Sequence, residues 1–204
     1  DTYREYKNLN SLWDKIKHRG KFGMTNHSFF HNRRILVTGS TGLLGSWLVE
    51  KLIFSGAIVT GISLDHSKDE LLVSKGILND IDNNYLDISD YEKVEKIIST
   101  GGFDIVLHLA AQTQVTDAIK NPITTLETNV QGTWNILEAC RKFELPLVSA
   151  SSDKAYGVSD KLPYLESYPL NGEFPYEVSK STSDLISTMY KTTYGVNVAS
   201  LRCG

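Results

Sequence analysis

The chain has 204 residues, of which 41% are hydrophobic and 22% are charged, and its formal net charge is −3. Such a chain can bury a sizeable core and fits one domain with a short appendage, which excludes disordered, collagen-like and low-complexity proteins. The slightly acidic balance favours neither a nucleic-acid partner nor an anionic membrane.

From Arg34 onward, apolar runs of strand length alternate with amphipathic segments of helix length. This pattern is typical of an α/β protein with a parallel sheet. The predicted strands are residues 34–38, 57–64, 84–88, 103–110, 145–150 and 197–202. The predicted helices are residues 43–55, 90–100, 124–143 and 176–194. Right-handed crossovers would place these helices on both faces of the sheet.

The turn after the first predicted strand is rich in glycine and opens a predicted helix. Glycine permits a tight turn and a close approach of the backbone to a pyrophosphate, which would lie on the free N–H groups of the helix. A simple glycine turn is the alternative, but the strand–turn–helix context favours a dinucleotide site in a Rossmann-type, doubly wound parallel sheet. The cofactor residues predicted here are Gly39, Thr41, Gly42, Leu43, Leu44 and Gly45.

Acidic residues follow the second and third predicted strands. Asp65 comes about 20 residues after Gly45, where a carboxylate can accept hydrogen bonds from the adenosine ribose and would repel a 2′-phosphate. This favours NAD over NADP, with an ordinary solvated aspartate as an equally good interpretation. Asp87 and Ile88 end the third predicted strand, where an acid could meet the edge of the adenine.

Tyr176 and Lys180 share one face of the predicted helix 176–194, so the phenol and the ammonium can meet at one site. The ammonium and a positive nicotinamide would lower the pKa of Tyr176 from about 10. Lys180 could also hold the nicotinamide ribose. A surface pair is the alternative for a Tyr-x-x-x-Lys pattern taken alone.

Ser152, Asp153 and Lys154 directly follow the fifth predicted strand. Their side chains would therefore lie at the active edge of the sheet, where a hydroxyl, a carboxylate and an amine can polarise a carbonyl and move protons. A polar loop that caps the strand is the alternative.

Four further residues stand out by their surroundings. His108 lies in an apolar strand and is predicted to be a satisfied core histidine. Asn129 lies in the middle of a predicted helix, where it could bridge to the active-site strands or serve as a buried structural amide. Trp47 and Trp134 are predicted to be core or packing residues.

The ordered motifs TGSTGLLG, HLAAQTQV, TNVQGTWNILEAC, SSDKAYG and YEVSK resemble those of extended short-chain dehydrogenases/reductases, over about residues 29–204. More narrowly, the chain is similar to nucleotide-sugar 4,6-dehydratases, and residues 151–186 are most similar to the CDP-glucose 4,6-dehydratase group. The resemblance implies that NAD is bound by the residues above together with Leu109, Ala110, Ala111, Thr113, Asn129, Tyr176 and Lys180.

The resemblance also implies a mechanism. Tyr176 would remove the C4 hydroxyl proton while a hydride passes from C4 to NAD. The resulting 4-keto group would acidify the C5 proton, whose loss lets water leave from C6, and the hydride would then return to C6. Ser152 would bond the C4 oxygen and Asp153 would protonate the departing C6 hydroxyl. Lys154 stands where dTDP-glucose dehydratases have a glutamate that acts at C5, so it would be either a base with a pKa lowered by burial or an enolate stabiliser.

Three other activities are kept as alternatives. An NAD-dependent 4-epimerase expels no water, so Asp153 argues against it. A decarboxylase of this family usually has a glutamate at the position of Lys154. A non-catalytic NAD-binding fragment is the third alternative.

The resemblance predicts two regions: an N-terminal extension, residues 1–28, and an NAD-binding domain, residues 29–204. Residues 1–23 resemble the tail of a sugar-1-phosphate nucleotidyltransferase, with an expression artefact or an unrelated leader as the alternatives. The resemblance also implies that the family's C-terminal substrate lobe would follow residue 204 and is not part of this sequence. A homodimer that pairs through the helices carrying Tyr176 and Asn129 is expected.

No apolar run reaches the roughly 20 residues of a membrane helix, and the polar N-terminal stretch does not resemble a signal peptide. Cys140 and Cys203 are far apart and have no metal-ligand spacing. These features predict a cytoplasmic protein with reduced thiols and no bound metal.

Overall fold

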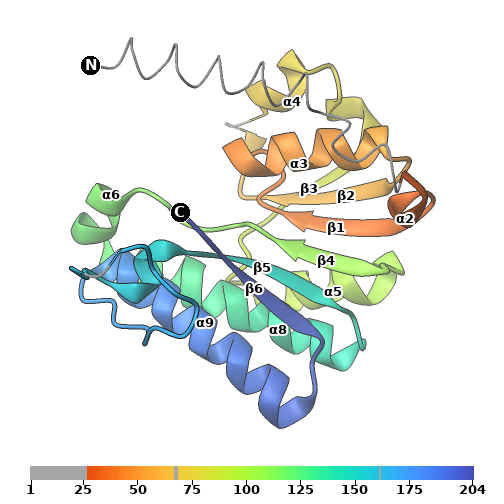
Figure 1. The fold of residues 1–204 in the computed structure, drawn as a ribbon. Coiled ribbons are helices and arrows are strands. Elements are labelled where there is room, and N and C mark those ends of the chain that lie inside the picture. Colours follow the sequence, from red (N-terminus) through yellow and green to blue (C-terminus); the bar gives the residue numbers. More distant parts are fainter. Residues whose placement is uncertain (1–26, 67–68, 161) are drawn as a thin grey trace.

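The computed structural model describes residues 27–66, 69–160 and 162–204. These residues form one parallel sheet with the strand order β3-β2-β1-β4-β5-β6 (Figure 1). The strands are β1 (Arg34–Thr38), β2 (Ile58–Ser63), β3 (Asp82–Tyr85), β4 (Ile105–His108), β5 (Leu147–Ser152) and β6 (Val198–Cys203). The order grows outward in both directions from the β1–β4 pair, which confirms the predicted doubly wound, Rossmann-type sheet.

Helices cover both faces of the sheet (Figure 1). One face carries α3 (Leu43–Phe54) and α4 (Glu70–Ser74), and the other carries α5 (Tyr91–Gly101), α8 (Gly132–Lys142) and α9 (Pro175–Tyr194). The remaining pieces are α2 (His27–Phe30), α6 (Val115–Lys120), α7 (Pro122–Leu126), the 3-10 helices η2 (Leu78–Asp80) and η4 (Asp153–Tyr156), and a π-helical turn, η3 (Glu127–Gln131).

Alternate residues of β1 serve the two faces, because successive side chains of a strand point in opposite directions. Ile35 and Val37 belong to the core cluster beneath α3 and α4. Leu36 belongs to the larger cluster on the side of α5 and α8, together with Ile136 of α8. All four side chains are fully buried, so the sheet is fixed between two apolar layers.

His108 links three elements of this core and is the satisfied core histidine that the sequence predicts. Its Nδ1 lies 2.7 Å from Thr38 Oγ1 and its Nε2 lies 3.1 Å from Thr133 Oγ1. Burial lowers the pKa of His108 to about 3, so the ring is neutral at physiological pH.

Several predicted elements are wrong in detail. The third strand is Asp82–Tyr85 rather than residues 84–88, so Asp87 and Ile88 lie in the turn beyond it. Residues 124–143 are not one helix, because the π-helical turn interrupts them between α7 and α8. The short helices α4 and α6 were not predicted.

The two tryptophans were predicted to be core or packing residues, and the structure corrects the first of these alternatives. Trp47 is 52% exposed and Trp134 is 41% exposed, so neither belongs to the core. Lys75 Nζ lies 3.2 Å from the centroid of the Trp47 ring, so this indole packs beneath a cation at the surface.

The domain boundary predicted between residues 28 and 29 falls within α2, and residues 1–26 lie outside the described residues. In the described part of the chain, no helix has the length and apolarity needed to cross a membrane. Cys140 is buried and Cys203 is exposed, and both are free thiols. The cytoplasmic location stays a prediction.

Candidate functional site

The glycine turn after β1 lies against the loop that follows β4, at the carboxyl edge of the sheet. Gly39 has a φ of +72°, and a Cβ added there would lie 2.8 Å from the backbone nitrogen of Ala110. Thr38 Oγ1 accepts hydrogen bonds from the N–H groups of Leu109 (3.2 Å) and Ala110 (3.1 Å). β1 and β4 flank the point where the strand order reverses, which is where ligands bind in open α/β sheets.

The start of α3 fits a pyrophosphate. Its N-cap, Gly42, provides no side-chain hydrogen bond, and no acidic residue lies in the first turn. Leu43 is 73% exposed and Leu44 is 55% exposed, so the turn is open to solvent. A Cβ at Gly45 would overlap the carbonyl oxygen of Gly39. A bare backbone with free N–H groups at a helix N-terminus is what a dinucleotide phosphate requires.

Two serines and an asparagine hold this turn to the neighbouring strands. Ser40 Oγ lies 2.8 Å from Ser63 Oγ at the end of β2 and donates to Asn83 Oδ1 of β3 (2.6 Å). Thr41, a predicted cofactor residue, is buried in the turn.

The predicted adenosine residues lie beyond the ends of β2 and β3. Asp65 and Asp87 are both exposed, and the carboxylate of Asp87 accepts a hydrogen bond from the N–H of Ser89 (2.8 Å). The Ile88 side chain is buried in the core, so only its backbone can face a ligand.

Tyr176 and Lys180 lie one turn apart on α9, and both are buried. Lys180 Nζ donates to the carbonyl oxygen of Ala150 in β5 (3.1 Å) and lies 6.0 Å from the centroid of the Tyr176 ring. The helix therefore presents both groups to the carboxyl end of β5, as the sequence predicts. Gly195, with a φ of +70°, ends this helix.

Burial shifts the pKa values of Tyr176 and Lys180 in opposite directions. Burial raises the pKa of Tyr176 above its usual value, the Ser152 hydroxyl opposes that rise, and the negative charge of Asp153 adds to it. The lowering expected from the ammonium together with a bound, positive nicotinamide stays a prediction. Burial lowers the pKa of Lys180 to about 8, against a weaker opposite effect of Cys203.

Ser152 and Asp153 lie side by side where β5 passes into η4. Ser152 Oγ donates to Asp153 Oδ1 (3.1 Å) and accepts the N–H of Lys154 (3.2 Å). Ser152 and Asp153 also affect the pKa of Tyr176, so the carboxylate, the hydroxyl and the phenol lie near one another at the end of β5. Lys154 is exposed at the start of η4, and its role as a base or as an enolate stabiliser stays a prediction.

Asn129 connects this place to the loop after β4. Its Oδ1 accepts the N–H of Gln112 (2.7 Å), and its Nδ2 donates to Gln112 O (3.0 Å) and to Ser179 Oγ (2.9 Å). Its carbonyl oxygen accepts the hydroxyls of Thr133 (2.5 Å) and Ser183 (2.7 Å). Asn129 is thus a buried amide that also bridges to the loop after β4, so both interpretations apply, and any contact of Asn129 with the cofactor stays a prediction. Ala111 and Thr113 belong to the same loop, where Thr113 is exposed.

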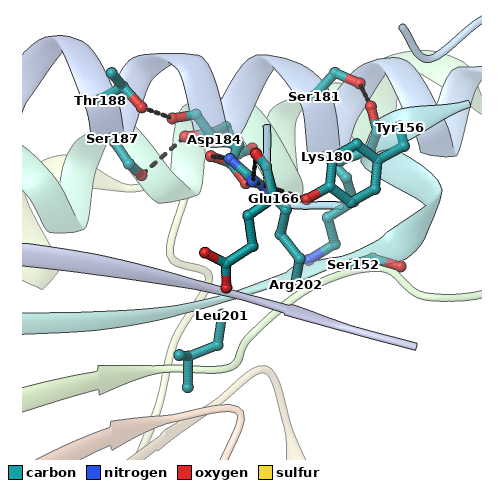
Figure 2. Close-up of polar contacts among 12 residues, drawn as sticks. Ser152, Tyr156, Glu166, Lys180, Ser181, Asp184, Ser187, Thr188, Leu201 and Arg202 are labelled. Carbon is teal, nitrogen blue, oxygen red and sulfur yellow. Dashed lines mark hydrogen bonds and ion pairs between the residues drawn. The ribbon is translucent and has the colours of Figure 1, made fainter. Parts of the chain in front are cut away.

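Sequence reasoning missed the ion pair beneath Lys180. Figure 2 shows Arg202 reaching from β6 to Asp184 on α9, with Nε 2.8 Å from Oδ2 and Nη2 3.0 Å from Oδ1. Arg202 Nη1 also donates to the Tyr156 hydroxyl in η4 (2.9 Å). The Asp184 side chain is only 1% exposed. The one signal in the sequence was the spacing of Tyr176, Lys180 and Asp184, which places all three on one face of a helix.

Comparison with known proteins places these features in context. The family model for GDP-mannose 4,6-dehydratase matches residues 36–204. The CDP-glucose 4,6-dehydratase of Salmonella typhimurium is 34% identical over 194 residues, which are 89% of this chain and 54% of that protein. A putative UDP-glucose 4-epimerase of Methanocaldococcus jannaschii is 37% identical over 174 residues, 82% of this chain and 54% of that protein.

Two solved structures from the same group of enzymes are similar to this chain in fold. A dTDP-glucose 4,6-dehydratase double mutant from Streptomyces venezuelae, with NAD bound, has a TM-score of 0.76 at 30% identity, over 83% of this chain and 55% of that one. A Thermus thermophilus UDP-glucose 4-epimerase in complex with NAD has a TM-score of 0.74 at 32% identity, over 83% and 54%. The chain spans about half the length of the curated relatives it matches.

Proposed function

The chain belongs to the GDP-mannose 4,6-dehydratase family of extended short-chain dehydrogenases/reductases, and from this premise we propose that it is the NAD-binding part of a nucleotide-sugar 4,6-dehydratase. One observation carries the choice of reaction: the Asp153 carboxylate lies beside the Ser152 hydroxyl and acts on Tyr176. Elimination of water needs an acid at this place, whereas 4-epimerisation does not. CDP-glucose is the first substrate candidate, supported by the similarity to the Salmonella enzyme.

The proposed roles follow from the positions of the side chains. The Tyr176 hydroxyl would take the proton of the C4 hydroxyl, and Ser152 Oγ would donate a hydrogen bond to the C4 oxygen. Asp153 would give its proton to the departing C6 hydroxyl while Lys154, the candidate base, would take the C5 proton that the 4-keto group acidifies; that proton would return to C5 when C6 receives the hydride. NAD, when bound, would accept a hydride from C4 and return one to C6. Lys180, held by Ala150 O, would orient the ribose next to Tyr176.

The reaction is tested by incubating the protein with NAD and, separately, with CDP-glucose, dTDP-glucose, GDP-mannose and UDP-glucose. We expect mass spectrometry to show the loss of one water from CDP-glucose. An isomer of unchanged mass from UDP-glucose would support the 4-epimerase instead. No product from any sugar, while NAD still raises the melting temperature, would support the non-catalytic fragment.

The Asp153→Asn variant tests the proposed acid. The amide keeps the size of the side chain but has no carboxylic proton to give, so we expect dehydration to slow by about 100-fold while the Kd for NAD stays unchanged. The rate of water loss and the NAD affinity would be measured on the same preparation. Dehydration by this variant at the wild-type rate would show that Asp153 is not the acid that protonates the C6 hydroxyl.

We also propose a homodimer through α8 and α9. These helices expose apolar side chains, among them Trp134 (41%), Leu185 (58%) and Met189 (41%). We expect sedimentation equilibrium at micromolar concentration to give twice the chain mass, and a monomeric mass would contradict this proposal.

A further inference from the structure

The turn between β3 and α5 is held to three neighbouring elements, namely strand β2, helix α5 and helix α8. Leu86 N donates to Ser63 O in β2 (2.8 Å), which ties the start of the turn to the sheet. The Asp87 carboxylate accepts the N–H of Ser89 (2.8 Å) within the turn. Asp90 then caps α5 by accepting the N–H of Lys93 (3.2 Å). The third of these elements is helix α8.

One buried carboxamide on α8 holds the middle of this turn. Asn135 is 4% exposed, and its Nδ2 donates to two successive carbonyl oxygens, Ile88 O (2.9 Å) and Ser89 O (2.8 Å). An amide nitrogen carries two protons, so both are used here. Gln131 Nε2 donates to Ser89 O as well (3.1 Å), which leaves Ile88 O dependent on Asn135.

The helix backbone lies very close to the turn. A Cβ added at Gly132 would lie 2.6 Å from Ile88 Cγ1, so the Ile88 side chain or the helix would have to shift to accept a larger residue. Packing and hydrogen bonding therefore fix the turn against α8 together.

The carbonyl groups of Ile88 and Ser89 both point to α8, which sets the path of the chain at Asp87 before them. In an extended strand, successive peptide groups point to opposite sides, whereas here both carbonyls point to α8. The amide therefore holds the chain in a bend. Asp87 follows β3, whose last residue Tyr85 pairs with Ser63 at the end of β2, so the exposed Asp87 carboxylate lies at the carboxyl edge of the sheet.

We propose that Asn135 is a positioning residue for recognition of the adenine: it holds the Asp87–Ser89 turn in the shape that presents Asp87 to the 6-amino group, without touching the cofactor. The inference rests on the proposed binding of NAD. An amino group donates to a carboxylate, whereas the 6-oxo group of hypoxanthine only accepts and would face the carboxylate unfavourably. The wild-type protein should therefore bind NAD more tightly than nicotinamide hypoxanthine dinucleotide.

The Asn135→Leu variant keeps the side-chain size and removes both donors. We expect its Kd for NAD to rise about tenfold and its preference for NAD over the hypoxanthine analogue to fall towards one, measured by isothermal titration calorimetry. A general loss of stability would weaken both ligands equally and leave this ratio unchanged. Gln131→Leu is the matched control, because Ser89 O keeps its bond from Asn135, and it should retain the wild-type ratio. If Asn135→Leu does not fold, Asn135→Ser, with one short donor, should give an intermediate ratio.

The outcomes separate the inference from the proposed function. A wild-type protein that binds neither dinucleotide overturns the NAD proposal, and the inference with it. A wild-type protein that prefers NAD, with an Asn135 variant that keeps the same preference, overturns the inference alone. Equal wild-type affinity for the two dinucleotides, or a Gln131→Leu variant that loses the preference as fully as Asn135→Leu, also overturns it.

Discussion

The Gly45→Ala variant is expected to lose about a thousandfold in affinity for NAD, equivalent to about 4 kcal/mol. The added Cβ would overlap the carbonyl oxygen of Gly39 and lie 2.8 Å from its carbonyl carbon and 3.1 Å from Ser40 Cα. All three atoms are backbone, so the turn itself must open. An open turn moves the N-terminus of α3 away from the pyrophosphate. Calorimetric titration would measure the affinity, and circular dichroism would show that the sheet is retained.

A matched glycine separates this effect from the general cost of adding a methyl group. Gly76 has a φ of +69°, yet an added Cβ there would meet nothing within 4 Å. Gly76→Ala should therefore cost about 1–2 kcal/mol of folding free energy through backbone strain and keep the affinity for NAD. A Gly45→Ala protein that binds within tenfold of the wild type would contradict the role assigned to the turn.

The Arg202→Met variant is expected to lower the free energy of unfolding by about 3–5 kcal/mol, because it leaves the Asp184 carboxylate buried without its partner. For a domain of this size, the melting temperature should fall by roughly 10 °C. Urea denaturation followed by circular dichroism would measure the change. The double variant Arg202→Met/Asp184→Leu should recover much of the loss, since neither charge then remains buried.

The chain offers a control of the same chemistry at the surface. Arg141 binds Glu138 with two hydrogen bonds, of 2.8 and 2.7 Å, but the two side chains are 39% and 31% exposed. Arg141→Met should therefore cost no more than about 1 kcal/mol. Equal losses in the two arginine variants would show that burial of the Arg202 pair is not the cause.

The sequence predicts most reliably where one physical signal acts alone. β1 was placed at its observed bounds because RILVT is apolar on both faces and a glycine turn follows it. β3 was placed too late because it is the edge strand: its residues DNNY pair with β2 on one side only and carry no apolar signal. Leu86 and Ile88 carry that signal, but they belong to the turn and to the core beneath α8.

The candidate site divides in the same way. Local spacing was enough to place Tyr176 with Lys180, and Ser152 with Asp153. The contact of Asn129 with Ser179 spans 50 residues, and that of Arg202 with Tyr156 spans 46, so no local pattern could indicate either. The rise that burial causes in the pKa of Tyr176 could not be predicted for a related reason: how completely neighbouring atoms exclude water from a side chain is a property of the packed fold.

The π-helical turn η3 lies between α7 and α8, and it limits how the length of this helical segment could change during evolution. Each residue inserted into or deleted from a helix rotates everything beyond it by about 100°. Asn129 lies within the turn and holds the loop after β4, whereas Asn135 lies beyond it and holds the turn after β3. A one-residue deletion would swing Asn135 away from Ile88 while Asn129 stayed in place. An exposed position such as Glu127 can accept substitutions, but the spacing of the two asparagines cannot change.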